Sequence, residues 1–524
     1  MTRYLLLPLL LVLWVQVQAE SPSKTVENRP TLQFEIISET AKRITHAFDL
    51  SISNLIDTNS ISYNIQKWND TGLLDTTKNR FFLRAAPSYG SNPWVHDGAY
   101  NTWSAMNLLE LNDGKPSPVA KNTLWACCDG QYENLIVNLP ESNKSEWYMY
   151  QMWIISAWNY YKISGDAGFL NDAYLAAVNT LTKHEQQHLN KKYGLFEGSY
   201  FIGDGIAGFP EPPMNPEIHN SNSFFHPGAH KSMVLSTNCV YVGAYNAASE
   251  MAKELGKSQD EISAHALKAE KLSGQINKYL WIPSKGLYGF FIHGTGTQSE
   301  GILDDTQEGS GISFAILFGV ADSIKTRQIL KNVHRQPQGI TMSWPHFSRF
   351  SDEKPGRHNA SIWPQVNGLF AHASCLGDRT DLFESEILNI AELYHKSGTI
   401  REIYQHITGE PFGGYQMKKN GEIGRWGSVN NQAWGAGGFL RMIFYGLFGF
   451  NFETDGIRFT PTLPEDWGGV SLNNLNYRDM TLNIRLSGSG NKIKGMTING
   501  VFAKEACMLS GLKGVQNIEI QLYE

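Results

Sequence analysis

The sequence predicts a mainly α-helical protein with a small antiparallel β domain at its C-terminus. Between residues 98 and 447, apolar residues recur at helical spacing in roughly a dozen segments, which clusters of Gly, Pro, Asn and Asp separate. From about residue 455 onwards, apolar and polar residues alternate, and Gly and Asn-Gly turns interrupt the pattern. Helical hairpins that follow one another without intervening strands are typical of an α/α arrangement, which can close into a ring.

The first residues have the pattern of a secretory signal peptide. Residues 1–19 carry Arg3, then a leucine-rich apolar run, then the small residues Val17 and Ala19. The run is too short and too poorly flanked for a membrane anchor, and no later segment is apolar enough to span a membrane. We therefore expect a secreted or periplasmic protein whose mature chain begins near Glu20.

The remaining chain divides into three parts by pattern. Residues 20–90 form a polar, irregular N-terminal extension with a helix expected at 39–54 and a short strand at 81–84. Residues 91–454 form the helical domain, and residues 455–524 form the β domain, which we expect to cover the outside of the helices. The helices expected in the helical domain span 98–112, 117–128, 147–164, 167–190, 236–256, 260–281, 305–319, 322–335, 360–376, 380–396 and 430–447.

Composition and charge exclude some partners. The formal net charge is −6 for 524 residues, and Lys and Arg are not clustered, so nucleic acid is not an expected partner. Aromatic residues make up 12% of the chain, with 14 Trp and 22 Tyr, and such rings can stack on the flat faces of sugars. The expected partner is a carbohydrate.

The cysteines predict neither a disulfide framework nor a metal site. Their odd number, spread over this length, does not form a disulfide scaffold, and no CxxC or HExxH motif occurs. We expect no metal and no cofactor, and we expect the cysteines to be mainly buried as small apolar residues. They are Cys127, Cys128, Cys239, Cys375 and Cys507.

Four long breaks between the expected helices are richer in aromatic residues, His and Pro than loops require. They span 87–97, 194–232, 336–359 and 398–430. A solvent-exposed loop gains nothing from exposing such rings. If the hairpins close into a ring, these loops meet at one end over a central funnel.

The last of these loops contains a candidate catalytic base. Glu402 follows an expected helix in GTIREIYQHITGEPFGG and is followed by Tyr404 and His406, which could orient it or line a water site. A carboxylate beside rings that hold a sugar can activate water at a glycosidic bond. The alternative is that Glu402 forms a helix-end ion pair with Arg401.

The mid-chain loop contains a candidate catalytic acid. In FIGDGIAGFP, Asp204 lies between Gly203 and Gly205, where the backbone can approach a ligand closely and the apolar surroundings would raise the pKa of the carboxyl. The alternative is an Asp-Gly turn. Glu197, in GLFEGSY, is the second candidate for the acid.

Three further groups of residues can hold a sugar. The groups are Trp94, His96 and Asp97 in WVHDGAY; His358, Asn359 and Trp363 in HNASIWP; and Gln432 and Trp434 in NNQAWGAGG. The first group could equally be a helix entry, where its aspartate would interact favourably with the helix dipole. The second could cap a helix beside a core tryptophan, and the third could simply be part of the core.

A fourth polar cluster is interpreted differently. GILDDTQEG carries Asp304, Asp305 and Glu308 but lacks the glycine and ligand spacing of a calcium loop. We interpret it as a solvated helix start.

Five motifs together resemble those of the six-hairpin glycosidases, and the resemblance covers roughly residues 80–510. The motifs are WVHDGAY, GDGIAGFP, HNASIWP, REIYQHITGEPFGG and NNQAWGAGGFLRMIFYGLFG. The layout is most similar to the trehalase and mannosyl-oligosaccharide glucosidase group, with a β tail similar to that of bacterial α-L-rhamnosidases and disaccharide phosphorylases. This resemblance implies an (α/α)6 barrel and inverting hydrolysis of a glycosidic bond. It implies Asp204 as acid, Glu402 as base and Asp97 as a contact of sugar hydroxyls. Trehalases carry a tryptophan directly before the acid, where this chain has Gly203.

Two other functions remain open from the sequence. One is a polysaccharide lyase, in which His358, Asn359 and a loop tyrosine such as Tyr404 would serve in β-elimination. The other is a glycan-binding protein without turnover. A phosphorylase is less favoured, because phosphate as nucleophile makes a base such as Glu402 unnecessary and no phosphate-binding loop is recognisable.

Overall fold

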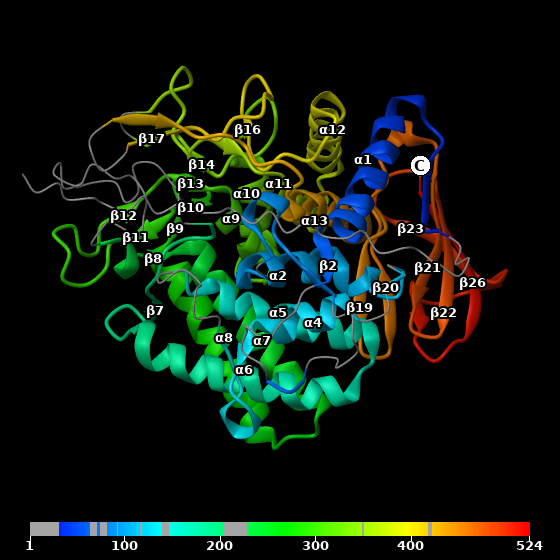
Figure 1. The fold of residues 1–524 in the computed structure, drawn as a ribbon, viewed down its shortest axis with the longest axis horizontal. Helices are drawn as coiled ribbons and strands as arrows, with labels where there is room; N and C mark the ends of the chain where they lie inside the picture. The colour runs from blue at the N-terminus through cyan, green and yellow to red at the C-terminus, as the bar shows by residue number, and fades with distance from the viewer. Residues whose placement is uncertain are drawn as a thin grey trace, which may run out of the picture.

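The computed structural model describes residues 31–523, apart from 63–70, 74–80, 92, 113, 116–117, 139–145, 203–227, 348–349 and 418–421. The expected signal peptide and Asp204 lie outside the described residues. The described chain forms a helical body beside a C-terminal sheet, which lies at the right of the view in Figure 1. Within the described residues, none of the helices has the length and the unbroken apolar character that crossing a bilayer requires.

Six helices form a closed inner ring, in which each packs against the next and the last packs against the first. The mainly α prediction and the α/α barrel are therefore confirmed. The inner helices are α2 (Val95–Asn101), α5 (Tyr148–Ser164), α7 (Leu235–Glu254), α9 (Gly309–Leu317), α11 (Pro364–Leu376) and α13 (Ala433–Arg441).

The other long helices alternate with the inner ones along the chain and form the outer layer. Among them, α1 packs against α12 and α13, so a helix from the expected N-terminal extension belongs to the barrel. The outer helices are α1 (Lys42–Ser53), α4 (Val119–Ala126), α6 (Ala167–His188), α8 (Gln259–Tyr279), α10 (Ser323–Asn332) and α12 (Thr380–Ser397). A short α3 (Asn107–Leu109) continues α2 after a π-helical segment at Thr102–Met106.

Sequence composition explains which helices are inner. Helix α9 has the sequence GSGISFAIL, without a charged residue, and residues 309–316 are all buried. Helix α8 is charged along most of its length and buries only Ala269, Leu272 and Ile276. A helix that is apolar all round must be enclosed by others, whereas an amphipathic helix covers the outside.

Short two- and three-residue strands join the barrel hairpins, and in Figure 1 several of them gather on the side opposite the C-terminal sheet. They are β2 (Ser60–Ser62), β3 (Phe81–Leu83), β4 (Cys128–Asp129), β5 (Ile136–Val137), β6 (Leu189–Asn190), β7 (Leu195–Phe196), β8 (Met233–Val234), β9 (Trp281–Ile282), β10 (Leu287–Tyr288), β11 (Phe291–Ile292), β12 (Leu303–Asp304), β13 (Gln307–Glu308), β14 (Ser343–Trp344), β15 (Ser361–Ile362), β16 (Tyr404–Gln405), β17 (Tyr415–Met417) and β18 (Ile423–Arg425).

The C-terminal part forms a six-stranded sheet in the order β1-β21-β22-β26-β23-β24 and a three-stranded sheet in the order β19-β20-β25. The expectation of an antiparallel domain is wrong for one pair, because β22 and β26 run parallel. The edge strand β1 comes from the N-terminal extension. The strands are β1 (Gln33–Ile36), β19 (Phe450–Glu453), β20 (Gly456–Phe459), β21 (Val470–Tyr477), β22 (Met480–Ser487), β23 (Ile493–Ile498), β24 (Val501–Phe502), β25 (Cys507–Leu509) and β26 (Gly514–Leu522).

The C-terminal sheets pack against the outside of the barrel, as expected. Phe34 of β1 lies with its ring centroid 5.0 Å from that of Phe48 in α1. Trp467 donates a 3.0 Å hydrogen bond from Nε1 to Glu384 of α12. All five cysteines are unbonded, and Cys127, Cys128 and Cys239 are buried, which confirms their interpretation as small core residues.

Candidate active site

Four aromatic side chains from three of the predicted groups form one continuous cluster. The ring of His96 stacks on Trp434 with centroids 5.3 Å apart, and Trp434 contacts Trp363 edge to face at 5.3 Å. Trp363 in turn meets His358 at 4.4 Å. This aromatic cluster joins residues 96, 358, 363 and 434, so the structure brings the early, middle and late motifs together.

The cluster lies where three inner helices begin. His96 is in the first turn of α2, Trp363 is the N-cap of α11, and Trp434 is the second residue of α13. The N-termini of inner helices therefore converge at this end of the barrel. Because helix N-termini carry partial positive charge, this end favours ligands rich in oxygen.

Asp97 lies beside the aromatic cluster, and only one of its two carboxylate oxygens has a partner among the described residues. It lies in the first turn of α2, as the helix-entry alternative states, and its side chain is 4% exposed. Oδ2 lies 2.8 Å from Nε2 of His96. Oδ1 is buried and has no hydrogen-bond partner among the described residues. A buried carboxylate oxygen in this state is costly unless a ligand or water completes it.

Three donors around the cluster are in the same state. Nε1 of Trp363, Nε1 of Trp434 and Nε2 of Gln432 are buried and lack a partner within the described part of the chain. Gln432 is the N-cap of α13, and its Oε1 accepts from Ala433 N at 2.8 Å, which fixes the direction of its amide. These residues pack as core side chains do, but core packing alone does not account for three unsatisfied donors around one cluster.

Glu402 lies on a loop and not on a helix. Helix α12 ends at Ser397, and Gly398 follows in the left-handed conformation with φ 62°. The helix-end alternative for Glu402 is therefore wrong. The backbone N–H of Glu402 donates to Val429 O at 2.8 Å, so the loop is paired with the segment that leads into α13.

Glu402 is 6% exposed, and both oxygens of its carboxylate accept hydrogen bonds. Tyr89 Oη donates to Oε1 at 2.7 Å, and Val429 N donates to Oε2 at 3.4 Å. Neither Tyr404 nor His406 orients it as considered from the sequence. Tyr404 Oη instead accepts from Arg401 N at 3.1 Å, and His406 Nε2 contacts Asp352 at 2.8 Å.

His358 connects the cluster to the start of the mid-chain loop. Its backbone is left-handed with φ 54°, and its ring lies beside the backbone of Ile202. Burial lowers the pKa of His358 well below its ordinary value, so the ring is neutral. Ile202 is the last described residue before the mid-chain loop and stands two positions before Asp204, so this end of the loop is adjacent to the aromatic cluster.

Asn359 has a structural role that the sequence did not predict. Its Oδ1 accepts from Ser343 Oγ and from Phe347 N, both at 3.2 Å. The helix-cap alternative is wrong, because α11 begins at Pro364 and its N-cap residue, Trp363, forms no side-chain cap. Asn359 therefore fixes the loop that precedes α11.

Two further predicted residues lie at the margins. Trp94 is the half-buried N-cap of α2, so part of its ring is accessible. Glu197 accepts a 2.6 Å hydrogen bond from Asn190 in the hairpin after α6. Among the described residues, Glu197 has no hydrogen bond or ion pair to the aromatic cluster.

Two residues at this end were missed or misread in the sequence. Tyr89, the partner of Glu402, lies in one of the aromatic breaks, but no spacing links it to a residue so distant in the chain. The expected solvated helix start at Glu308 is wrong, because this carboxyl is 0% exposed. It accepts from Ser236 N at 3.0 Å and Ser310 Oγ at 3.1 Å, and burial raises its pKa to about 8.

Two family models match parts of the chain. The family described as mannosylglycerate hydrolase MGH1-like glycoside hydrolase domain matches residues 119–418, which is more than half of the chain. The C-terminal domain of glycosyl hydrolase family 65 matches residues 450–495. No curated protein matches the sequence.

Two solved structures, both with TM-scores above 0.5, show the same fold at low identity. A GH78 family rhamnosidase of Bacillus sp. GL1 is similar with a TM-score of 0.57 and 14% identity, covering 94% of this chain and 44% of its own. A structure named sialidase has a TM-score of 0.57 and 16% identity, covering 92% of this chain and 42% of its own. The chain thus spans less than half the length of these two proteins. A GH63 mannosylglycerate hydrolase from Thermus thermophilus has a TM-score of 0.49 and 14% identity, covering 69% of this chain and 96% of its own.

Proposed function

Because the chain belongs to the mannosylglycerate hydrolase MGH1-like family of glycoside hydrolases, we propose that it cleaves a glycosidic bond in an oligosaccharide or polysaccharide with inversion. In this proposal Glu402 is the base and Asp204 is the acid. Inverting hydrolysis needs an ionised carboxylate that activates water and a protonated carboxyl that donates to the leaving oxygen. The single observation that carries the proposal is the Glu402 carboxylate, which is buried, accepts a hydrogen bond from Tyr89, and lies on a loop paired with the segment that leads into α13.

Glu402 is suited to the role of base. Tyr89 and Val429 both donate to its carboxylate oxygens, and an ionised carboxylate accepts such bonds best. Its loop pairs with the segment leading into α13, whose second residue Trp434 belongs to the aromatic cluster. A water held by this carboxylate would attack a sugar that lies against the cluster.

The assignment of the acid is supported by chain connection. Asp204 follows two residues after Ile202, whose backbone contacts His358 in the cluster. Gly203 and Gly205 on either side of Asp204 allow the backbone to approach a ligand, and the apolar residues after them favour the protonated carboxyl. Glu197 is the alternative acid.

The unsatisfied polar groups suit a sugar. Asp97 Oδ1 can accept from a hydroxyl, and the indole N–H groups of Trp363 and Trp434 can donate to one. Sugar hydroxyls both donate and accept, so one ring can satisfy groups of both kinds. We propose that the non-reducing sugar occupies this position.

Tyr404 is unsuited to act as the base of the lyase alternative. Tyr404 is 0% exposed, its hydroxyl is bound by Arg401 N, and burial raises its pKa to about 12. We also propose that the protein is exported through the signal peptide at residues 1–19. Sequencing the N-terminus of the protein from a culture medium or periplasmic fraction tests this, and an intact Met1 would contradict it.

The experiment compares variants on a panel of aryl glycosides and oligosaccharides that includes mannosylglycerate. Glu402→Gln and Asp204→Asn should each lower kcat by roughly 10²–10⁴ without loss of folding, because each removes one proton-transfer role while keeping shape. The matched control is Glu410→Gln, an exposed glutamate in the same loop, which should retain activity. Full activity of Glu402→Gln would overturn the base assignment. If Asp204→Asn is active and Glu197→Gln is not, the acid is Glu197.

A further inference from the structure

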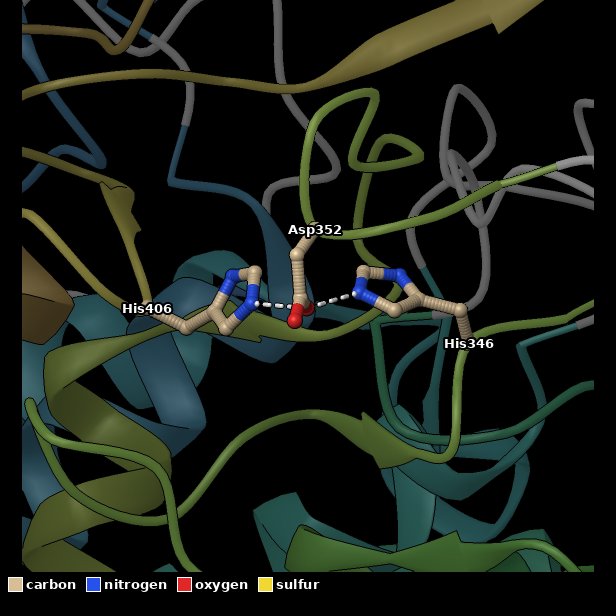
Figure 2. A group of neighbouring side chains, drawn as sticks. All are labelled: His346, Asp352 and His406. Atoms are coloured by element: carbon tan, nitrogen blue, oxygen red, sulfur yellow. Dashed lines mark hydrogen bonds and ion pairs between the residues drawn. The ribbon is translucent and has the colours of Figure 1, made fainter.

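Two histidines and an aspartate form a compact cluster outside the aromatic cluster. His346 follows β14, Asp352 lies on the turn after it, and His406 follows β16. Figure 2 shows Asp352 between the two imidazole rings. Its Oδ1 lies 2.9 Å from Nε2 of His346 and 2.8 Å from Nε2 of His406. The candidate ligand atoms all lie within 4.8 Å of one another.

We propose that His346, Asp352 and His406 bind a divalent first-row transition metal, best represented by Zn²⁺. Imidazole nitrogen and carboxylate oxygen are ligands that Zn²⁺ accepts readily, whereas Ca²⁺ and Mg²⁺ prefer sites made of oxygen alone. With bonds of about 2.0–2.2 Å, a metal holds neighbouring ligand atoms roughly 3 Å apart. The two nitrogen–oxygen distances already have this size, and all three ligand atoms lie within 4.8 Å of one another, so side-chain movements can bring them around one ion.

The exposure of the three side chains is that of a metal site with one coordination position open to solvent. The side chain of His406 is 0% exposed, that of His346 is 9% exposed, and that of Asp352 is 44% exposed. The histidines are therefore held rigidly by the protein, while the carboxylate faces solvent and gives an ion a route of entry. Trp344 lies beside both imidazole rings, at 5.6 and 6.4 Å between centroids, and forms an apolar wall. Water can complete the coordination from the solvent side.

The site joins two loops that also shape the candidate active site. Phe347, next to His346, donates from its N–H to Asn359 of the loop before α11. His406 lies four residues after Glu402, and its carbonyl accepts from Gln338 N at 3.2 Å. A bound ion would cross-link the 336–359 and 398–430 loops. This inference concerns metal binding and does not depend on which residues are the acid and base.

No sequence motif predicts this site. Asp352 and His406 are 54 residues apart, and the spacing His346 to Asp352 is common in loops. The expectation of no metal rests on the absence of CxxC and HExxH motifs, which this cluster does not need. The pairing of β15 with β16 and the hydrogen bond from Gln338 N to His406 O bring the loop of His406 toward that of His346.

The test uses full-length protein without a histidine tag, stripped with a chelator and titrated with ZnCl₂ by calorimetry. We expect one equivalent to bind and the Tm to rise with the concentration of Zn²⁺, because an ion that binds only the folded state stabilises it. Bound Co²⁺ should give a visible absorption spectrum that Zn²⁺ displaces. Absence of saturable binding, or binding without change in Tm, would overturn the proposal.

Variants locate the binding. Asp352→Asn replaces a charged ligand with a neutral amide, and His406→Ala removes a ligand, so each should weaken Zn²⁺ binding by at least about tenfold. Asp352 is half-exposed, so its variant keeps the fold and remains informative if His406→Ala does not fold. The control is His334→Ala, a neighbouring histidine that stacks on Trp344 but is not a member of the cluster. Equal binding by wild type and Asp352→Asn would show that Zn²⁺ binds elsewhere.

Discussion

The hydroxyl of Tyr89 donates a 2.7 Å hydrogen bond to Oε1 of Glu402, across 313 residues of sequence. This contact joins the segment before the first inner helix, α2, to the loop before the last, α13. The two segments meet where the ring of inner helices closes. The candidate base is therefore oriented by the closure of the barrel itself and not by its own loop alone.

Removing this donor should change the pH dependence of activity. Tyr89→Phe deletes one hydrogen bond to the ionised carboxylate of Glu402, which disfavours the ionised form and raises the pKa of the base. The acidic limb of the pH profile of kcat/KM should shift to higher pH by about one unit, so that the variant is less active than wild type at acidic pH. The control is Tyr132→Phe, because Tyr132 is 86% exposed and is not part of the candidate active site. An unchanged acidic limb for Tyr89→Phe would mean that Glu402 is not the base that titrates.

The unpartnered indole of Trp434 should matter for substrate and little for stability. Trp434→Phe keeps an aromatic ring between His96 and Trp363 but removes Nε1–H, so KM should rise by roughly tenfold if that group donates to a sugar. The matched variant is Trp153→Phe, whose buried Nε1 donates to Leu124 O at 2.7 Å. Both variants lose the same volume, so their packing costs are comparable.

The two indole variants should therefore show contrasting effects on KM and on Tm. Trp153→Phe loses the hydrogen bond to Leu124 O and should lower Tm more than Trp434→Phe does, with KM unchanged. Thermal unfolding and steady-state kinetics on both variants measure the contrast. The same KM for Trp434→Phe and wild type would remove Trp434 from the sugar site.

Glu308 should make stability depend on pH. Its pKa is raised to about 8 by burial, above that of an unfolded glutamate near 4.5. The stability that the protonated carboxyl provides is present in full below about pH 4.5 and is lost as pH rises through about 8. Glu308→Gln stays neutral and can still accept from Ser236 N, so it should not lose this stability.

The difference in Tm between Glu308→Gln and wild type should therefore grow from about pH 5 to about pH 8.5. Taking the difference cancels the other groups that titrate in both proteins. Parallel Tm curves for the two proteins would contradict the buried, protonated state of Glu308.

The sequence predicted the helices well, because the apolar period and the Gly and Pro breaks are local signals. The expected helix at 380–396 corresponds to α12 at Thr380–Ser397, for example. The parallel pairing of β22 with β26 and the edge strand β1 could not be predicted, because alternation shows which residues face the core but not which strand lies beside which.

The site was predictable in part for the same reason. Aromatic motifs marked His96, Trp363 and Trp434, and the fold places them in contact. Tyr89 beside Glu402 and the pairing of Asp352 with His406 depend on distant segments meeting, which no local spacing encodes. The burial of Glu308 was missed because a run of acidic residues at a helix start usually faces solvent.

The stereochemistry of the first product tests the central claim most directly. Proton NMR can follow the anomeric signal of the sugar released by wild-type enzyme from a substrate of defined configuration, before mutarotation equilibrates the anomers. If Glu402 activates water on the face opposite the leaving group, the first product has the inverted configuration. A first product that keeps the configuration of the substrate would contradict the account, since it requires a covalent intermediate on a carboxylate nucleophile.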